Sequence, residues 1–140
     1  MIYMKEGFNI IEELNIPADF QSLVDVENLV DRVCHTVGVQ EDAYGNVLIA
    51  VTEAVNNAIS HGSQQDKSLN VAVYVADATE SFCFAVKDEG QGFDYHNLPD
   101  PTAPENILKE NGRGIFLMKN LSDEVEYNEQ GNQVSLYFVK

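Results

Sequence analysis

Two polar side chains stand four residues apart in a segment whose other positions have the pattern of a buried helix. On a helix Glu53 and Asn57 lie one above the other, and His61 continues their row beside the apolar stripe. A carboxylate next to a neutral amide oxygen is a poor ligand set for tight Zn²⁺ binding. The pair suits Mg²⁺, which takes one or two protein oxygens together with phosphate oxygens and water. The spacing therefore indicates chemistry on a phosphate group.

A second polar group directly follows a strand pattern, in the segment 88–93. Gly90 and Gly92 let the backbone approach a flat ligand closely. A buried Asp88 can accept a hydrogen bond from an exocyclic amine such as that of adenine. An Asp-x-Gly-x-Gly run alone is usually only a turn, so it indicates a ligand site only in combination with other motifs.

A third group stands where a helix is expected to begin. Gly112 and Gly114 leave N–H groups at the positive end of the helix dipole, which is a ready site for phosphate. Arg113 adds a charged guanidinium group to that site. It is not a dinucleotide fingerprint, because no strand precedes it and the third glycine is missing. Each group alone is a weak signal, and the interpretation as a nucleotide site depends on the order and spacing of all three.

The elements that must position these groups follow from hydrophobic periodicity. Apolar residues three and four apart predict three helices: from Asp19 or Ser22 to Gly38, over 41–61, and over 112–121. Gly62 is a natural stop for the second helix. Alternating residues predict five strands: 8–17, 69–76, 81–87, 124–128 and 133–139. In the first of these, Phe8, Ile10 and Ile16 are expected on one side, with Ile11 breaking the alternation.

The element order predicts one domain spanning residues 1–140. Short turns between neighbouring strands favour antiparallel pairs, and grouped helices favour a two-layer α+β sandwich. We expect a mixed, mostly antiparallel sheet with the helices on one face. The stretch 94–111 holds three of the four prolines and little periodicity, which suggests a functional loop or lid.

Composition narrows the function classes. With 8 basic and 23 acidic residues the net charge is -15, which argues against direct nucleic-acid binding and against an anionic membrane surface. The two cysteines, Cys34 and Cys83, are too few for a disulfide framework and are expected to be buried thiols. No signal-peptide pattern and no apolar run long enough to span a membrane is present, so we expect a cytoplasmic protein.

The three groups together resemble the motifs of the Bergerat-fold ATPases, which include gyrase, heat-shock chaperones and histidine kinases. The resemblance rests on three strings: Glu53-x-x-x-Asn57 as the N box, Asp88-x-Gly90-x-Gly92-Phe93 as the G1 box, and Gly112-x-Gly114-Ile115 as the G2 box. The string over 51–62 is closer still to one branch, the anti-sigma factors that are also serine-protein kinases. The resemblance covers nearly the whole chain.

The resemblance implies a role for each matching residue. Asn57 would hold Mg²⁺, and Asp88 would bind the adenine amine of ATP in a pocket shaped by Gly90 and Gly92. The segment 112–114 would close over the phosphates, and His61 would be a structural hydrogen-bonding residue. Glu53 would receive or orient the proton of the attacking hydroxyl, which is adequate because phosphoryl transfer needs chiefly positioning and charge neutralisation.

It also implies an activity and partners. A member of this branch holds a sigma factor and phosphorylates a serine or threonine of an anti-anti-sigma (STAS-type) protein. It is cytoplasmic and makes no direct contact with nucleic acid or membrane. Members commonly dimerise, so the resemblance allows a homodimer.

Two other functions stay open. The run Gly131-Asn132-Gln133 stands where the branch often has Gly-Thr-Thr, and this departure motivates a non-catalytic, nucleotide-gated binding module. The catalytic domain of a histidine kinase is the other alternative. It is disfavoured because none of His35, His61 and His96 stands at the head of a helical hairpin. Fold alone does not choose among these functions.

Overall fold

The computed structural model describes residues 2–63, 66–90 and 110–140. It contains, in chain order, β1 (Asn9–Pro17), the 3-10 turn η1 (Phe20–Ser22), α1 (Leu23–Val37), α2 (Glu41–Asn57), the π turn η2 (Ala58–Gly62), β2 (Asn70–Asp77), β3 (Ser81–Asp88), α4 (Glu110–Leu121), β4 (Glu124–Tyr127) and β5 (Gln133–Val139). The predicted loop over 94–111 lies almost entirely outside the described residues.

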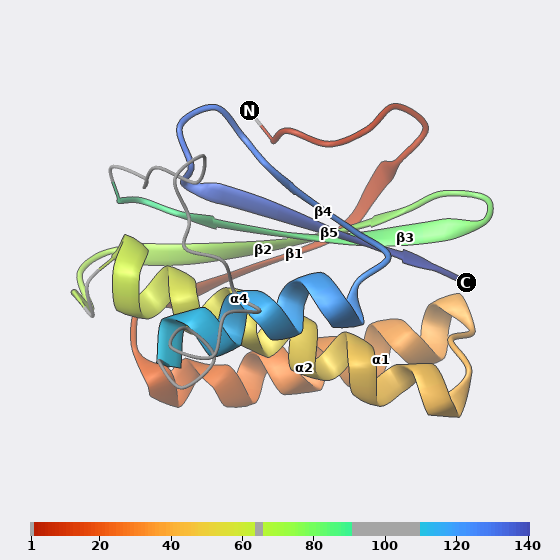
Figure 1. Ribbon diagram of the computed structural model, residues 1–140, viewed down its shortest axis with the longest axis horizontal. Helices are drawn as coiled ribbons and strands as arrows, with labels where there is room; N and C mark the ends of the chain where they lie inside the picture. Colours follow the sequence, from red (N-terminus) through yellow and green to blue (C-terminus); the bar gives the residue numbers. More distant parts are fainter. Residues whose placement is uncertain (1, 64–65, 91–109) are drawn as a thin grey trace.

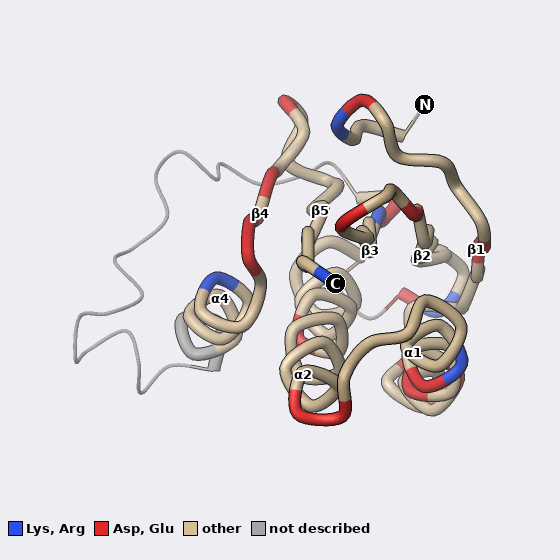
Figure 2. Tube along the Cα trace, turned by 90° about the vertical axis from the view of Figure 1, so that its right-hand side faces the viewer, with Lys and Arg blue, Asp and Glu red and all other residues tan. Residues whose placement is uncertain are grey.

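The five strands form one sheet in the order β1-β2-β3-β5-β4, and every pairing among them is antiparallel. The helices α1, α2 and α4 lie side by side beneath one face of this sheet, as Figure 1 and the rotated view of Figure 2 show. This is the α+β two-layer sandwich that the sequence predicts. A sheet and a helix each have one apolar face, and stacking them buries both.

The core between the two layers comes from alternating strand residues. Val73 pairs with Val86 and Val86 with Val134, so three neighbouring strands present valine at the same level of the inner face. Val73 is fully buried and Val86 is 2% exposed. This alternation fixes the register of the sheet, because a slip of one residue would turn the whole apolar row toward solvent.

The first helix begins and ends as predicted. The Asp19 carboxylate accepts a hydrogen bond from the Gln21 N–H (3.1 Å) and caps η1, which leads directly into α1. Gly38 ends α1 with a φ of 76°, a left-handed conformation that glycine adopts without strain.

Cys34 on this helix and Cys83 on β3 are both free and buried, as expected.

The side assignment for the first strand is wrong in one respect. A β-bulge lies between Ile10 and Glu12, so that Ile10 pairs with Ala76 and Glu12 with Val75. The extra residue reverses the alternation. Ile16 therefore faces the core, whereas Ile10 is 51% exposed and Phe8 packs on the opposite face of the sheet.

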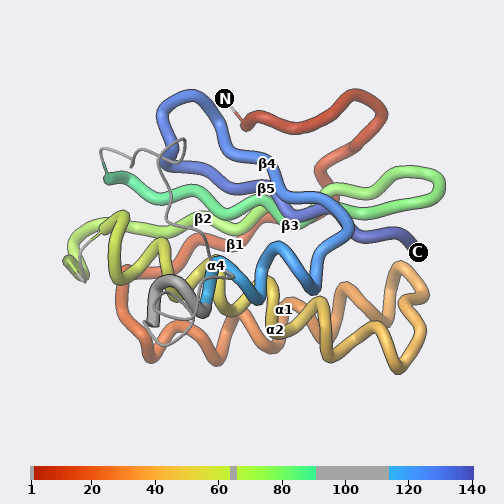
Figure 3. Tube along the Cα trace, viewed as in Figure 1, coloured from red at the N-terminus to blue at the C-terminus, as the bar shows by residue number. Residues whose placement is uncertain are grey.

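That opposite face carries the N-terminal segment, residues 3–8. It runs over the sheet on the side away from the helices (Figure 3). Its contacts include Phe8 against the Tyr137 ring, with centroids 5.2 Å apart, and Lys5, whose ammonium lies 2.5 Å from the Glu124 carboxylate. Within the described residues, no helix has both the length and the apolarity that a membrane crossing requires.

Candidate functional site

A cavity of about 260 Å³ lies where the end of α2, the ends of β3 and β5, and the start of α4 meet. Most of its wall is apolar, and Asp88 and Asn57 add polar groups. A mainly apolar cavity with a few convergent polar groups is the usual form of a small-molecule site. The lining residues are Ala54, Asn57, Ala58, His61, Gly62, Val86, Asp88, Ile115, Met118, Tyr127, Gly131, Asn132, Gln133 and Val134.

The second helix leaves the regular α conformation at this cavity. The sequence predicts a helix to His61, but α2 ends at Asn57 and continues as the π turn η2. The Ser63 N–H donates to the Ala58 carbonyl (2.8 Å), which is the wider hydrogen bond of a π turn. Such turns often occur at functional sites, and this one brings Gly62 against β3.

The Asp88 carboxylate is the acidic group of the cavity, and the side chain is 8% exposed. The Gly90 N–H donates to its Oδ1 (2.7 Å), and its own backbone N–H donates to the Asn132 carbonyl (2.9 Å). Burial raises the pKa of the Asp88 carboxyl, and the Gly90 hydrogen bond opposes that rise in part. The result is a fixed, largely desolvated hydrogen-bond acceptor.

Glycine is required at two positions around this carboxylate. A Cβ added to Gly62 would fall on the Asp88 carboxylate, 2.7 Å from Oδ1 and nearer still to Oδ2. A Cβ added to Gly90 would meet the backbone carbonyl of Gly62. The close approach expected at Gly90 is therefore an approach to the backbone of η2, and it holds the end of α2 and the end of β3 together.

The candidate phosphate end lies where α4 crosses α2. A Cβ built on Gly114 would be 2.8 Å from Glu53 Oε2 and 3.5 Å from Asn57 Oδ1. Glu53 and Asn57 thus share one side of α2, as their spacing predicts, and both face the start of α4. Gly114 is buried against them.

The donor set at this end fits Mg²⁺ better than a tightly held transition metal. Among the described residues, no three His, Cys, Asp or Glu side chains converge to bind a metal ion. An amide oxygen at Asn57 with a carboxylate at Glu53 close by resembles the incomplete shells that Mg²⁺ completes with phosphate and water. A metal ion here would depend on a ligand that brings oxygens of its own.

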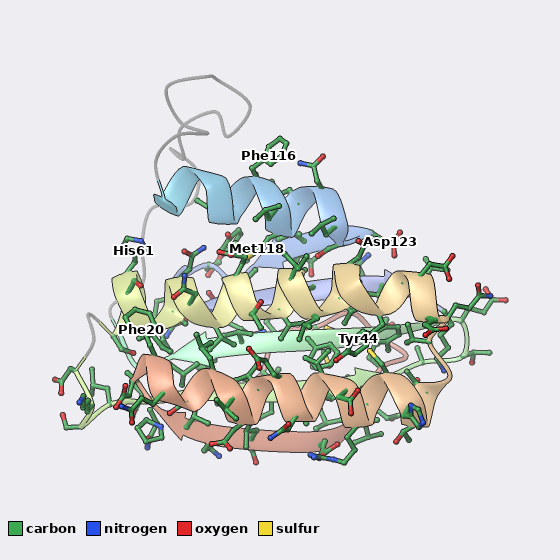
Figure 4. All side chains as sticks on the ribbon, turned by 90° about the horizontal axis from the view of Figure 1, so that it is seen from below. Phe20, Tyr44, His61, Phe116, Met118 and Asp123 are labelled. Atoms are coloured by element: carbon green, nitrogen blue, oxygen red, sulfur yellow. The ribbon has the colours of Figure 1, made fainter. Side chains whose placement is uncertain are left out.

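The other predicted site residues are only partly described. Gly112 and Arg113 belong to the first turn of α4, which confirms a helix there, but nothing is described of the Arg113 side chain. Gly92 lies outside the described residues. His61 lines the cavity, and Figure 4 shows it in η2, at the end of the molecule where α4 begins.

Sequence reasoning missed the far wall of the cavity. Met118, 2% exposed, points from α4 toward α2, whereas Phe116 points away (Figure 4). Tyr127 on β4 and Val134 on β5 complete this wall. Burial raises the pKa of Tyr127 to about 12, so its phenol is neutral at physiological pH. The alternation of β4 and β5 could have placed both residues on the inner face, but no motif marks them.

Gln133 is one of the lining residues, but its side-chain amide is engaged away from the cavity. Its side-chain amide donates to the Tyr3 carbonyl and to Ser135 Oγ, on the outer face of the sheet. The departure from Gly-Thr-Thr therefore puts no bulky side chain toward Glu53 and Asn57. Chemically, the cavity offers one buried acceptor and an apolar slot, and Asn57 on its wall belongs to the carboxylate–amide pair that faces Gly114 of α4.

Three comparisons with known proteins agree with this geometry. The family model described as the histidine kinase-like ATPase domain matches residues 16–138. The chain is 30% identical over 132 residues to the serine-protein kinase RsbW of Staphylococcus aureus strain JH9, and equally to that of strain Newman. Each match covers 89% of this chain and 83% of the relative.

A solved structure shows the same fold. The crystal structure of the RsbU and RsbW domains of Rv1364c from Mycobacterium tuberculosis matches with a TM-score of 0.56 and 16% identity. The match covers 92% of this chain but only 32% of that chain, so this chain spans about a third of its length. Together the comparisons confirm the resemblance indicated by the three motifs.

Proposed function

Because the chain belongs to the histidine kinase-like ATPase domain family, we propose that it binds ATP with Mg²⁺ and phosphorylates a serine or threonine of a partner protein. The observation that carries the proposal is the arrangement around the cavity. It puts a buried acceptor, Asp88, at one end and the Glu53–Asn57 pair beside Gly114.

Asp88 is proposed to recognise the adenine. Its desolvated carboxylate accepts a hydrogen bond from the exocyclic amine, and the apolar walls from Val86, Ile115 and Met118 enclose the base. The Gly90 N–H orients the carboxylate before the ligand arrives. Gly90 is proposed to shape this end of the pocket together with Gly92, which lies outside the described residues.

Glu53 and Asn57 are proposed to act on the phosphates. Asn57 would hold Mg²⁺, which when bound neutralises the phosphate charge. Gly112 and Arg113 lie in the first turn of α4 and Gly114 directly follows it, and this helix start would close over the phosphates. The partner's hydroxyl oxygen forms a bond to the γ-phosphorus, the bond to the β–γ bridging oxygen breaks, and ADP leaves. Glu53 takes the hydroxyl proton.

The relatives support the choice of acceptor. They are named serine-protein kinases, and the chain resembles the branch that acts on anti-anti-sigma proteins. We propose a STAS-type anti-anti-sigma protein as the substrate and a sigma factor as the second partner. The site for both would be on a single domain, residues 1–140, working in the cytoplasm without direct nucleic-acid contact, as a monomer or a homodimer.

Isothermal titration of MgATP into wild type, Asp88→Asn and Asn57→Ala tests the pocket. We expect micromolar binding by wild type, at least tenfold weaker binding by Asp88→Asn, and reduced Mg²⁺ dependence in Asn57→Ala. Transfer of labelled γ-phosphate to a STAS protein from the same genome then tests the kinase activity. Binding without transfer, with Glu53→Ala regulating its partner like wild type, would favour the nucleotide-gated module. Absence of ATP binding in wild type would reject the proposal.

A further inference from the structure

The N-terminal segment is fastened to β5 at the residue where the strand meets the cavity. The Gln133 Nε2 donates to the Tyr3 carbonyl (2.6 Å), and the Tyr3 N–H donates to Gln133 Oε1 (3.1 Å). The side-chain amide thus pairs with the Tyr3 backbone as the peptide group of a neighbouring strand would. We call this pair of hydrogen bonds the amide clamp.

The β5 side of the amide clamp is buried, whereas Tyr3 is 51% exposed, and the polar groups of the clamp are satisfied. Gln133 is 2% exposed and Ser135 is fully buried. The second Nε2 proton goes to Ser135 Oγ (3.0 Å), and Ser135 Oγ donates to the Tyr3 carbonyl (3.0 Å). Both donors of the amide are used, so none is left for a phosphate. Loss of Tyr3 contact would leave buried groups unpaired, which opposes opening of the clamp.

The same residue is tied to the candidate site through its backbone. The Gln133 N–H donates to Asn128 Oδ1 (3.2 Å), and Gln133 pairs with Lys87 of β3. One residue earlier, the Asn132 carbonyl accepts the N–H of Asp88 (2.9 Å). The clamp is therefore one peptide group away from the hydrogen bond that fixes the cavity's acidic residue.

We propose that Gln133 is a positioning residue for ligand binding and that the N-terminal segment acts as a strap. By holding Gln133, the strap fixes the start of β5 and the Asn132 carbonyl, and thereby the backbone of Asp88. This inference rests on the proposed function only for the identity of the ligand, MgATP. The hydrogen-bond chain Tyr3–Gln133–Asn132–Asp88 itself does not depend on it.

The chain offers a matched control on the same segment. Lys5 fastens the strap farther along. Its ammonium contacts the Glu124 carboxylate and the Tyr137 ring, and its backbone N–H donates to the Tyr137 hydroxyl (3.0 Å). Lys5 does not line the cavity. Lys5→Ala therefore loosens the strap without touching the route to Asp88, whereas Gln133→Ala breaks the route.

The test compares the full-length variants Gln133→Ala, Ser135→Ala and Lys5→Ala with wild type. We expect the dissociation constant for MgATP to rise about tenfold in Gln133→Ala, which is the effect of roughly one hydrogen bond. The rise is expected to be smaller in Ser135→Ala and under about twofold in Lys5→Ala. Thermal unfolding temperatures are measured in parallel, so that a general loss of stability is separated from a loss of affinity.

Amide hydrogen exchange without nucleotide gives a second readout. Faster exchange at Asp88 and over 131–134 in Gln133→Ala, but not in Lys5→Ala, supports positioning through the clamp. Wild-type affinity together with wild-type exchange at these amides in Gln133→Ala would overturn it. If wild type binds no ATP, the proposed function fails, and the exchange comparison still decides the inference. If Gln133→Ala does not fold, Ser135→Ala carries both comparisons.

Discussion

The carboxylate of Asp88 packs directly against the Cα of Gly62, so that even a methyl group at Gly62 would occupy the position of the carboxylate. This contact joins the end of the π turn to the end of β3 and leaves no freedom for the acidic side chain on that side. The residue that ends the second helical segment is thus also the residue that makes room for the candidate ligand-binding acid.

Gly62→Ala should therefore displace the Asp88 carboxylate without unfolding the chain. The obstructing atoms belong to a side chain that can rotate, so we expect at least tenfold weaker MgATP binding with a modest change in unfolding temperature. Gly45→Ala is the matched control on the preceding helix, because a Cβ at Gly45 meets nothing within 4 Å. That control should bind ATP normally and gain roughly 0.5–1 kcal/mol of stability. Equal affinity in both variants would contradict the contact's role.

Gly114→Ala should affect catalysis more than binding. The added methyl group would lie 2.8 Å from Glu53 Oε2, closer than van der Waals contact allows, while Asn57 is 3.4 Å away at its nearest atom. Glu53 must move, so we expect the rate of phosphoryl transfer to fall about 100-fold, the effect of displacing a catalytic group by roughly 1 Å. The dissociation constant for MgATP should change less than the rate. Single-turnover transfer at saturating ATP separates the two, and an unchanged rate would reject Glu53 as the base.

Much of this fold could be predicted because its signals are local. The helix stop at Gly38 and the inner rows of β2, β3 and β5 follow from glycine chemistry and period-two alternation. The β1 bulge could not be predicted, because an irregularity of one residue leaves the composition of the strand unchanged. Ile11 marked a break in the pattern, but only pairing with β2 decides on which side the next residue falls.

For the candidate site, too, the sequence predicts what local patterns encode but not the contacts between distant segments. Glu53, Asn57 and Asp88 could be named because their spacing and neighbouring glycines form motifs, and the first two do share one side of α2. The roles of Gly62 and Gln133 depend on contacts between segments distant in sequence. No local pattern encodes them: the sequence places Gln133 on the ligand side, whereas its hydrogen bonds to Tyr3 put its side-chain amide on the outer face of the sheet.

Asp88→Asn should change the pH dependence of stability. Because burial raises the pKa of this carboxyl above its ordinary value of 3.8, the folded state holds the proton more tightly than the unfolded state. The unliganded chain therefore loses stability from this group as pH rises from that value through the raised pKa. Asn is neutral throughout, so the variant should lack this decline and be at least as stable as wild type at pH 7. Urea unfolding between pH 4 and 8 measures it, and a steeper decline in the variant would refute the assignment.

Asn128 should be the residue on which the turn before β5 depends. Its Oδ1 accepts three backbone N–H groups, from Gly131 (2.8 Å), Asn132 (3.1 Å) and Gln133 (3.2 Å). Asn128→Ala removes this shared acceptor. The Gly131 N–H keeps the Asn128 backbone carbonyl (3.1 Å), but the N–H groups of Asn132 and Gln133 lose their side-chain partner. A cost of about 1–3 kcal/mol is expected, because water can replace only part of the lost hydrogen bonding. Asn128→Asp keeps an acceptor oxygen and loses only the Nδ2 donation to Asn132 Oδ1 (2.8 Å), so it should be the milder change. Since Gly131 and Asn132 line the cavity, MgATP affinity should fall in the same order as stability. If Asn128→Ala unfolds at the wild-type urea concentration, the three side-chain hydrogen bonds do not organise the turn, and the backbone hydrogen bonds of the turn and the strands suffice to hold this wall of the cavity.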